Sequence, residues 1–166
     1  ITGLDWILET GADVVELADL KAPWKNYGPV RWVLAVKNGS EFESVGDLQG
    51  KRIAAEAVGL TKAFLAKHKV EAEVEFSWGA TEAKAADGLV DAIVEVTESG
   101  STIRAHGLKI IHELFCSNPQ LIANKQALQD PRKREKIDQI SLLLKGALAA
   151  EAKVGIKMNV SKEQLD

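Results

Sequence analysis

Residues 91–108 contain the residue types that could bind a phosphorylated sugar. An apolar run that carries the acids Asp91 and Glu95 leads into a turn of small hydroxyl residues around Gly100. We expect a helix to begin near Ser101, and the first turn of a helix exposes unpaired N–H groups that suit an anion. Gly100 lets the backbone approach such an anion closely. The hydroxyl donors of this turn are Thr97, Ser99, Ser101 and Thr102.

Glu95 has a separate use in this interpretation. A carboxylate accepts hydrogen bonds from two neighbouring hydroxyls, such as the 2′ and 3′ hydroxyls of a ribose. Glu95 lies just before the turn, so it could meet a ribose whose 5′-phosphate rests at residues 99–102. An acid on an otherwise buried strand is also costly unless something pairs with it. The alternative is purely structural, with Ser101 or Thr102 as a helix cap and no ligand.

The elements that must position this segment alternate between strands and helices. An apolar or alternating pattern predicts strands at residues 12–20, 30–36, 52–55, 71–76, 89–96 and 108–114. Helices are expected at residues 5–10, 44–50 and 60–68, and residues 22–29, with two prolines and a glycine, are expected to form a loop. This alternation predicts an α/β fold with largely parallel sheets.

Two local patterns allow more detailed predictions. Residues 71–76 alternate, with Phe76 on the apolar side, which is typical of a half-buried strand near the edge of a sheet. Asp130 precedes Pro131, a pair that is typical of the cap and first position of a helix. The apolar stripe expected on that helix consists of Ile137, Ile140, Leu144 and Leu148.

The composition excludes several classes of protein. The 166 residues are 46% hydrophobic and 27% charged, a globular balance, and the net charge of −3 argues against a nucleic-acid-binding protein. No apolar run reaches the roughly 20 residues that a membrane span needs. Cys116 is the only cysteine, so we expect a small buried hydrophobe rather than a disulfide, a zinc cluster or a catalytic thiol. These features predict a cytoplasmic protein with no nucleic-acid or membrane partner.

Both ends of the chain are expected to be truncated. The sequence begins with Ile1, Thr2 and Gly3 rather than with methionine, and it stops where another amphipathic segment begins near Gln164. We therefore expect a piece of a longer protein.

The sequence GLVDAIVEVTESGSTIRAHGL (residues 88–108) resembles the phosphoribosyl-pyrophosphate loop of ATP phosphoribosyltransferases. The family pattern is approximately G-L-A-D-A-I-[VC]-D-L-[VT]-[SE]-T-G-[TA]-T-L-[RE]-A-N-G-L. Glu95 stands where the family usually has Asp, and Ala85 and His106 stand where it often has Pro and Asn. Further segments are similar to family segments in the same order: ITGLDW (1–6), LQGKRIA (48–54), GATE (79–82), LIAN (121–124) and KVGIKMNV (153–160).

The resemblance to the long form of this family implies a particular architecture. It implies a two-domain α/β catalytic region of the periplasmic-binding-protein type (type II), followed by the start of a ferredoxin-like regulatory domain. Domain I would comprise residues 1–37 and 115–150. Domain II, which carries the phosphoribosyl loop, would comprise residues 38–114, and residues 151–166 would open the regulatory domain.

The resemblance also implies an activity. The family transfers the phosphoribosyl group of phosphoribosyl pyrophosphate (PRPP) to N1 of ATP and releases pyrophosphate, the first step of histidine biosynthesis. It implies Mg²⁺ as cofactor, ATP and PRPP as substrates, histidine as feedback inhibitor, and a homo-oligomer for the complete protein. No side-chain nucleophile and no metal ligand is assigned. The positions that match the PRPP site are Glu95, Thr97, Glu98, Ser99, Gly100, Ser101 and Thr102, and possible cleft residues are Glu82, Asp91, Thr2, Gly3 and Asp5.

Two alternatives remain open at this point. The chain could be a bilobal solute-binding protein, which has the same kind of fold but binds its ligand without a reaction. It could also be an inactive fragment that binds only a ribose phosphate, because the family's opening strand and Lys-Gly-Arg motif are not among these residues.

Overall fold

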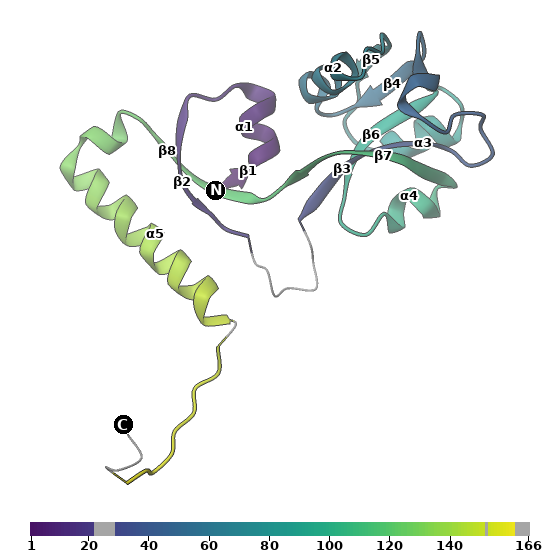
Figure 1. Cartoon of the computed structure of the whole chain (residues 1–166). Helices are drawn as coiled ribbons and strands as arrows, with labels where there is room; N and C mark the ends of the chain where they lie inside the picture. Colours follow the sequence, from purple (N-terminus) through teal and green to yellow (C-terminus); the bar gives the residue numbers. More distant parts are fainter. Residues whose placement is uncertain (22–28, 152, 162–166) are drawn as a thin grey trace.

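The computed structural model describes residues 1–21, 29–151 and 153–161 (Figure 1). The loop predicted at residues 22–29 lies outside the described residues except for Pro29, and so does the segment near Gln164.

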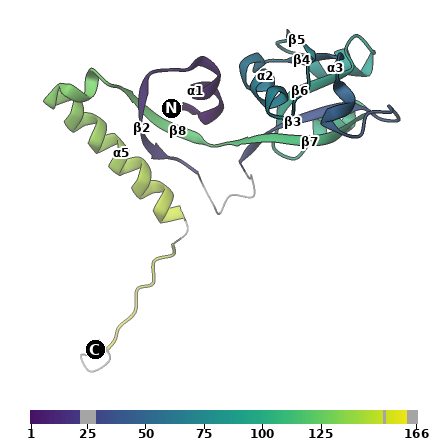
Figure 2. The same cartoon turned by 45° about the horizontal axis from the view of Figure 1, so that its top comes forward.

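Two β-sheets of different size form the body of the molecule (Figures 1 and 2). The larger sheet has the strand order β5-β4-β6-β3-β7, and the smaller one has the order β1-β8-β2. The larger sheet contains β3 (Val30–Lys37), β4 (Arg52–Ala55), β5 (Glu73–Phe76), β6 (Ala92–Thr97) and β7 (Leu108–Ser117). The smaller sheet contains β1 (Thr2–Gly3), β2 (Val14–Asp19) and β8 (Pro119–Asn124).

Helices connect most of these strands. They are α1 (Leu4–Thr10), α2 (Val58–Lys67), α3 (Thr81–Ala86), α4 (Ser101–Ala105) and α5 (Pro131–Glu151), with short 3₁₀ helices η1 (Val45–Leu48) and η2 (Ala127–Gln129). In the part of the chain that the structure describes, no helix is both long and apolar enough to cross a membrane.

The prediction of largely parallel sheets is wrong. Strand β4 runs parallel to β5 and β6, but β3 is antiparallel to β6 and β7, and β8 is antiparallel to β1 and β2. The reason is the route of the chain between the two sheets. The chain enters the larger sheet on β3 and leaves it on β7, which continues into β8 after only Asn118, so these two strands run in opposite directions (Figure 1).

The strand at residues 30–37 belongs to the larger sheet. It pairs with β6 from Arg31 to Val36 and with β7 from Val30 to Lys37. The range expected for domain I included these residues, whereas the structure separates them from the smaller sheet of β1, β2 and β8. The prediction that this strand is buried on both faces is confirmed, because Val33 to Val36 have no exposed surface.

The larger sheet has a hydrophobic cluster on each face. On one face, residues such as Trp32, Leu34 and Ile53 pack against α2 through Leu65. On the other face, Val33, Ala35 and Ile93 pack with Ile103 of α4 and Ala85 of α3. Alternate residues of β3 therefore serve opposite faces, as strand geometry requires.

The long helix α5 begins as predicted but packs differently. The Asp130 Oδ1 atom accepts hydrogen bonds from the N–H groups of Arg132 (2.9 Å) and Lys133 (3.3 Å), so Asp130 caps the helix. Ile137, Leu144 and Leu148 of the predicted stripe are partly buried, but Ile140 is half exposed and Ser141 is buried instead. Ser141 is four positions after Ile137 and Ile140 is three. At 3.6 residues per turn, the fourth position lies closer than the third to the side that Ile137 faces.

One further prediction differs from the structure at its periphery. Strand β5 does lie at the edge of the larger sheet, but Phe76 at its end is 66% exposed rather than on a buried face. The segment at residues 153–160, which resembles the opening of a regulatory domain, forms no strand and has exposed side chains, and its assignment to that domain stays a prediction. A strand requires a hydrogen-bonded neighbour, and no described strand pairs with this segment.

Candidate functional site

Three glutamates meet at one edge of the larger sheet. Strands β4 and β6 are parallel neighbours, with Ala55 opposite Val94, so Glu56 after β4 and Glu95 near the end of β6 lie at the same edge. Glu82 comes from the first turn of α3 at this edge, and its charge and that of Glu56 act on Glu95. The carboxyl ends of parallel strands are where ligands bind in open α/β sheets.

Glu95 is the most perturbed acid of this group. Burial raises the pKa of Glu95 above its ordinary value, and the charges of Glu82 and Glu56 raise it further. Hydrogen bonds from the Val96 N–H group (3.1 Å) and the Thr81 hydroxyl oppose this increase in part. Burial makes the charged form of Glu95 unfavourable unless a partner compensates for it. An acid of this kind at the ligand-binding edge of a sheet is a candidate for a binding role.

The raised pKa of Glu95 predicts a pH-dependent effect on stability. The folded protein holds this proton more tightly than the unfolded chain, so the stability contribution of Glu95 falls as the pH rises from below 4.5 through the raised pKa. We therefore expect Glu95→Gln to raise the melting temperature at pH 7 and to lose this advantage at pH 4. Thermal unfolding at both pH values tests this, with Glu73→Gln on exposed β5 as the control. An equal gain at both pH values would contradict it.

The hydroxyl turn follows directly from β6. The Gly100 N–H group donates to Thr97 Oγ1 (2.8 Å), and Ser99 Oγ donates to Ser101 Oγ (3.0 Å). Gly100 has a φ of +72°, a conformation that glycine adopts without strain, and it is the N-cap of α4. The N-cap is Gly100, so neither Ser101 nor Thr102 caps α4 as the purely structural alternative expected, although Ser99 Oγ accepts the Ser101 N–H group (3.3 Å). The side chains that remain exposed around the turn are those of Glu98, Ser99, Ser101 and Thr102.

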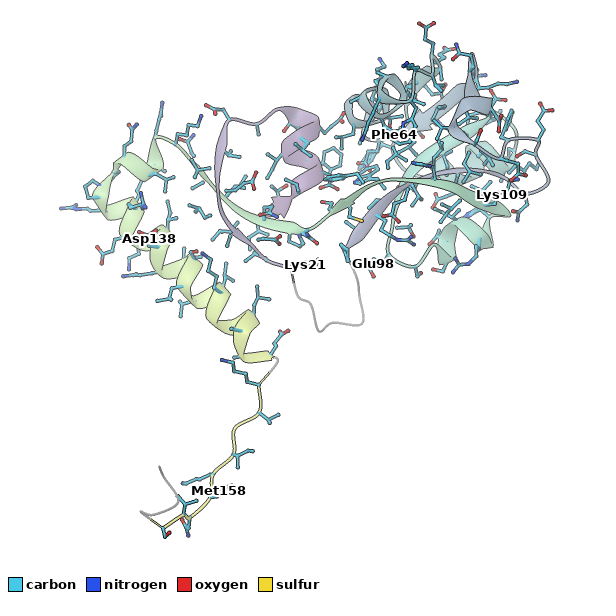
Figure 3. The ribbon with its side chains drawn as sticks, viewed as in Figure 1. Lys21, Phe64, Glu98, Lys109, Asp138 and Met158 are labelled. Carbon is cyan, nitrogen blue, oxygen red and sulfur yellow. The ribbon has the colours of Figure 1, made fainter. Side chains whose placement is uncertain are left out.

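Two arginines that the sequence did not single out flank this turn. Arg31 on β3 lies opposite Thr97, and its Nη2 atom is 3.5 Å from the Glu98 carbonyl oxygen. Figure 3 shows Glu98 at the end of the larger sheet where β3 enters it. A Cβ added to Gly100 would lie 3.0 Å from Nη1 of Arg104, which places the Arg104 guanidinium against the turn. An isolated arginine in an apolar strand was the only available sequence signal for Arg31.

Comparison with known proteins shows which protein family this chain belongs to. The family model described as "HisG: ATP phosphoribosyltransferase" matches residues 1–146. The chain belongs to the ATP phosphoribosyltransferase family. The resemblance predicted from six ordered segments is thereby confirmed.

Curated members of the ATP phosphoribosyltransferase family are similar over the whole chain. The proteins of Chlorobium chlorochromatii and Desulfatibacillum aliphaticivorans are 57% and 55% identical over 166 residues. The chain spans only 56% and 57% of their respective lengths.

Solved structures confirm the predicted fold class. The ATP phosphoribosyl transferase (HisG:HisZ) complex from Thermotoga maritima superposes with a TM-score of 0.73 at 24% identity, over 89% of this chain and 68% of that one. The periplasmic aliphatic sulphonate-binding protein from Escherichia coli gives a TM-score of 0.57 at 16% identity, over 88% of this chain and 52% of that one. Since these identities are low, the likeness concerns the two-domain α/β fold and not the ligand.

Not every residue that matches a family position lies near Glu95. Asp91 stands at the other end of β6, where its Oδ2 atom accepts the Arg52 N–H group (2.9 Å). It precedes Glu95 by four positions along an extended strand, which is roughly 13 Å. Thr2 and Gly3 pair with Gln120 and Pro119 of β8 in the smaller sheet. Glu82 therefore lies near enough to Glu95 to affect its pKa, whereas Asp91 lies at the opposite end of β6.

Asp5 of the ITGLDW segment has a structural position. Its side chain is buried, and its Oδ2 atom accepts a 2.7 Å hydrogen bond from the indole N–H of Trp32 on β3. The Asp5 N–H group in turn donates to the Ser117 hydroxyl at the end of β7 (3.2 Å). Asp5 thus ties α1 to both strands that connect the two sheets.

Glu9 makes a further connection that the sequence did not predict. Its two carboxylate oxygens accept hydrogen bonds from the N–H groups of Gly59 (2.8 Å) and Leu60 (2.7 Å) in the first turn of α2. A carboxylate in this position satisfies helix donors that otherwise lack a partner. It joins α1, which is next to the smaller sheet, to the helix that follows Glu56.

The expectation that Cys116 is buried is wrong. The thiol is exposed and donates a hydrogen bond to Glu113 Oε1 (3.0 Å). This hydrogen bond is the largest cause that raises the pKa of Cys116, followed by desolvation and the charge of Glu113. A raised pKa disfavours the thiolate, so nucleophilic catalysis by Cys116 is not supported.

Proposed function

We propose that this chain forms part of the catalytic region of an ATP phosphoribosyltransferase, which transfers the phosphoribosyl group of PRPP to N1 of ATP and releases pyrophosphate in histidine biosynthesis. The observation that carries the proposal is the junction of β6 and α4. Here a partly buried acid, Glu95, stands directly before an exposed hydroxyl turn, in a chain that is 57% identical to a curated member of the family.

The roles of the residues at this junction follow from their chemistry. Glu95 accepts hydrogen bonds from the 2′ and 3′ hydroxyls of the ribose, which would compensate for its burial. The exposed hydroxyls of Ser99, Ser101 and Thr102 hold the 5′-phosphate, and Gly100, whose N–H group donates to Thr97, gives the turn the shape that presents them. Glu98 completes the turn with its backbone.

The reaction at C1 of the ribose passes through an oxocarbenium-like state. Positive charge develops on the sugar as pyrophosphate departs, so preorganised negative charge stabilises this state. Glu56, Glu82 and Glu95 supply such charge around the proposed ribose position. Catalysis by this chain then consists of orientation and electrostatic stabilisation, without a side-chain nucleophile.

Mg²⁺ fits this site as a partner of the substrate phosphates. No group of three or more His, Cys, Asp or Glu side chains is placed to hold a metal among the residues that the structure describes. Mg²⁺ in phosphoryl sites is often held by one or two carboxylates together with substrate phosphates, and Glu82 and Glu95 are suitable carboxylates. When bound, it would neutralise the charge of the leaving pyrophosphate.

The assembly and its regulation are part of the same proposal. We assign the smaller sheet to domain I and the larger sheet, now including β3, to domain II, and residues 151–166 would open a regulatory domain that binds histidine as feedback inhibitor. The solved relative from Thermotoga maritima is a complex, which supports an oligomer as the working form. We place the enzyme in the cytoplasm, where ATP and PRPP are available as substrates.

A pyrophosphate-release assay tests the proposed function. We expect a form of the protein extended to the length of its relatives to release pyrophosphate only when ATP and PRPP are both present. This 166-residue chain should bind ribose 5-phosphate in calorimetry with little or no turnover. Release that does not depend on ATP, or none from the extended form, would contradict the proposal.

A further inference from the structure

The proposed phosphate turn lies in acidic surroundings. Glu95, on which the charges of Glu56 and Glu82 act, lies two residues before Thr97, and Glu98 is part of the turn. A phosphate dianion would add further negative charge at this place. Helix α4, which begins at the turn, has only five residues, so its dipole is too short to compensate for so many charges. A phosphate that binds here needs a cationic side chain.

Arg31 is the side chain best placed to supply this charge. It is the cross-strand neighbour of Thr97, whose hydroxyl accepts the Gly100 N–H group. Cross-strand neighbours point to the same face of a sheet, so Arg31, Thr97 and the turn share one face. The 3.5 Å distance from Arg31 Nη2 to the Glu98 carbonyl oxygen is at the limit of a hydrogen bond, and this nitrogen is therefore available to a stronger acceptor.

Glu113 holds Arg31 in this position. The Arg31 Nη1 atom lies 3.1 Å from Glu113 Oε2, and the two side chains are 33% and 43% exposed. An ion pair with this exposure contributes little stability and exchanges readily. A phosphate with two charges can therefore compete with Glu113 for the guanidinium, whose planar geometry suits two-point contact with phosphate oxygens.

Arg104 lies against the turn on the α4 side. Its Nη1 atom is 3.0 Å and its Cζ atom 3.9 Å from the position of a Cβ on Gly100. The guanidinium thus reaches back along α4 to the residue that begins the helix.

We propose that Arg31, together with Arg104 beside Gly100, neutralises the 5′-phosphate, and that Glu113 pairs with Arg31 while no phosphate is bound. This inference rests on the proposed function, since it concerns the same phosphate. It implies that Arg31 on β3 and its partner Glu113 on β7 affect phosphate binding, in addition to the contiguous residues of β6 and α4.

Binding of ribose 5-phosphate to single variants of this chain tests the inference. We expect Arg31→Ala to weaken binding in calorimetry about tenfold or more, and Arg31→Lys to weaken it less, because the charge is kept but the two-point geometry is lost. Arg104→Ala should also weaken it. Glu113→Gln should leave binding unchanged or tighten it several-fold, since it removes a competitor for Arg31. Arg52→Ala, which removes an ion pair with Glu75 at the other end of β4, is the control.

The different outcomes for Arg31→Ala, which weakens binding, and Glu113→Gln, which does not, distinguish ligand binding from a structural ion pair. If the pair only stabilises the fold, both variants weaken binding alike, and the inference fails. It also fails if Arg31→Ala binds as tightly as the unchanged protein. Failure of the proposed function is separate, because then the unchanged protein itself does not bind ribose 5-phosphate. Thermal unfolding of each variant verifies that it is folded, and Arg31→Lys provides the measurement if Arg31→Ala is not.

Discussion

Replacing Gly100 by alanine should weaken the binding of ribose 5-phosphate by about tenfold or more, which is about 1.4 kcal/mol. The residue has a φ of +72°, and an added Cβ would lie 3.0 Å from Arg104 Nη1 and 3.1 Å from Ile110 Cδ1. Both contacts are tighter than ordinary packing, so Arg104 or the turn must move. The cradle that Gly100 forms between Thr97 and Ser101 would then no longer fit a phosphate.

Gly107→Ala is the matched control for this variant. Gly107 has a φ of +70° at the other end of α4, but nothing lies within 4 Å of its Cβ position. Gly107→Ala should lower the free energy of unfolding by about 1 kcal/mol, because it places alanine in a left-handed conformation, and Gly100→Ala should lower it by at least as much, because it adds two close contacts. Urea unfolding and calorimetry measure the two effects separately. If Gly107→Ala weakens binding equally, destabilisation of α4 explains the loss; if Gly100→Ala binds normally, the phosphate lies elsewhere.

The elements of the fold were predictable where their signal is local. The apolar run of β3 and the Asp130-Pro131 start of α5 each correspond to an element of the structure. The direction of the strands was not predictable in this way, since a buried strand has the same pattern in a parallel and an antiparallel sheet. That direction depends on the long-range pairing of β3 with β6 and β7.

The site divides along the same line. Glu95 and the hydroxyl turn are contiguous in sequence, so their combination was visible as a motif. Arg31 precedes Glu98 by 67 residues and reaches it only through the register of β3 on β6. Glu56 likewise meets Glu95 only because β4 and β6 are parallel neighbours.

Exposure was the property that the sequence predicted least well. Cys116 and Phe76 have hydrophobic side chains, yet both are exposed in the structure. Each lies at or near an end of a strand in an outer position of the larger sheet, β7 or β5. A pattern of residue types does not reveal which strand ends are covered by neighbouring elements.

Glu95→Ala should raise the Michaelis constant for PRPP by about 10- to 100-fold in a protein of the relatives' full length, with little change in that for ATP. Hydrogen bonds to a charged acceptor contribute about 1.5–3 kcal/mol, which corresponds to this range. The effect should be confined to PRPP because the carboxylate is proposed to contact the ribose hydroxyls of PRPP and not those of ATP. Initial rates measured with each substrate varied in turn provide both constants.

Two companion variants separate the contact from the charge. Glu95→Gln keeps one acceptor oxygen and should raise the constant for PRPP less than Glu95→Ala does, while Glu73→Ala on the exposed surface of β5 should leave it unchanged. If Glu95→Ala and Glu95→Gln reduce the maximal rate but not the affinity for PRPP, the carboxylate stabilises charge in the transition state rather than holding the ribose. An unchanged Michaelis constant and rate would remove Glu95 from the site.

The affinity of the unchanged protein for PRPP should also depend on pH. Protonation of Glu95 removes its negative charge, and burial raises the pKa of this carboxyl. As the pH is lowered, the affinity for PRPP should therefore begin to fall at a higher pH than the ordinary carboxyl pKa of 4.5 would give.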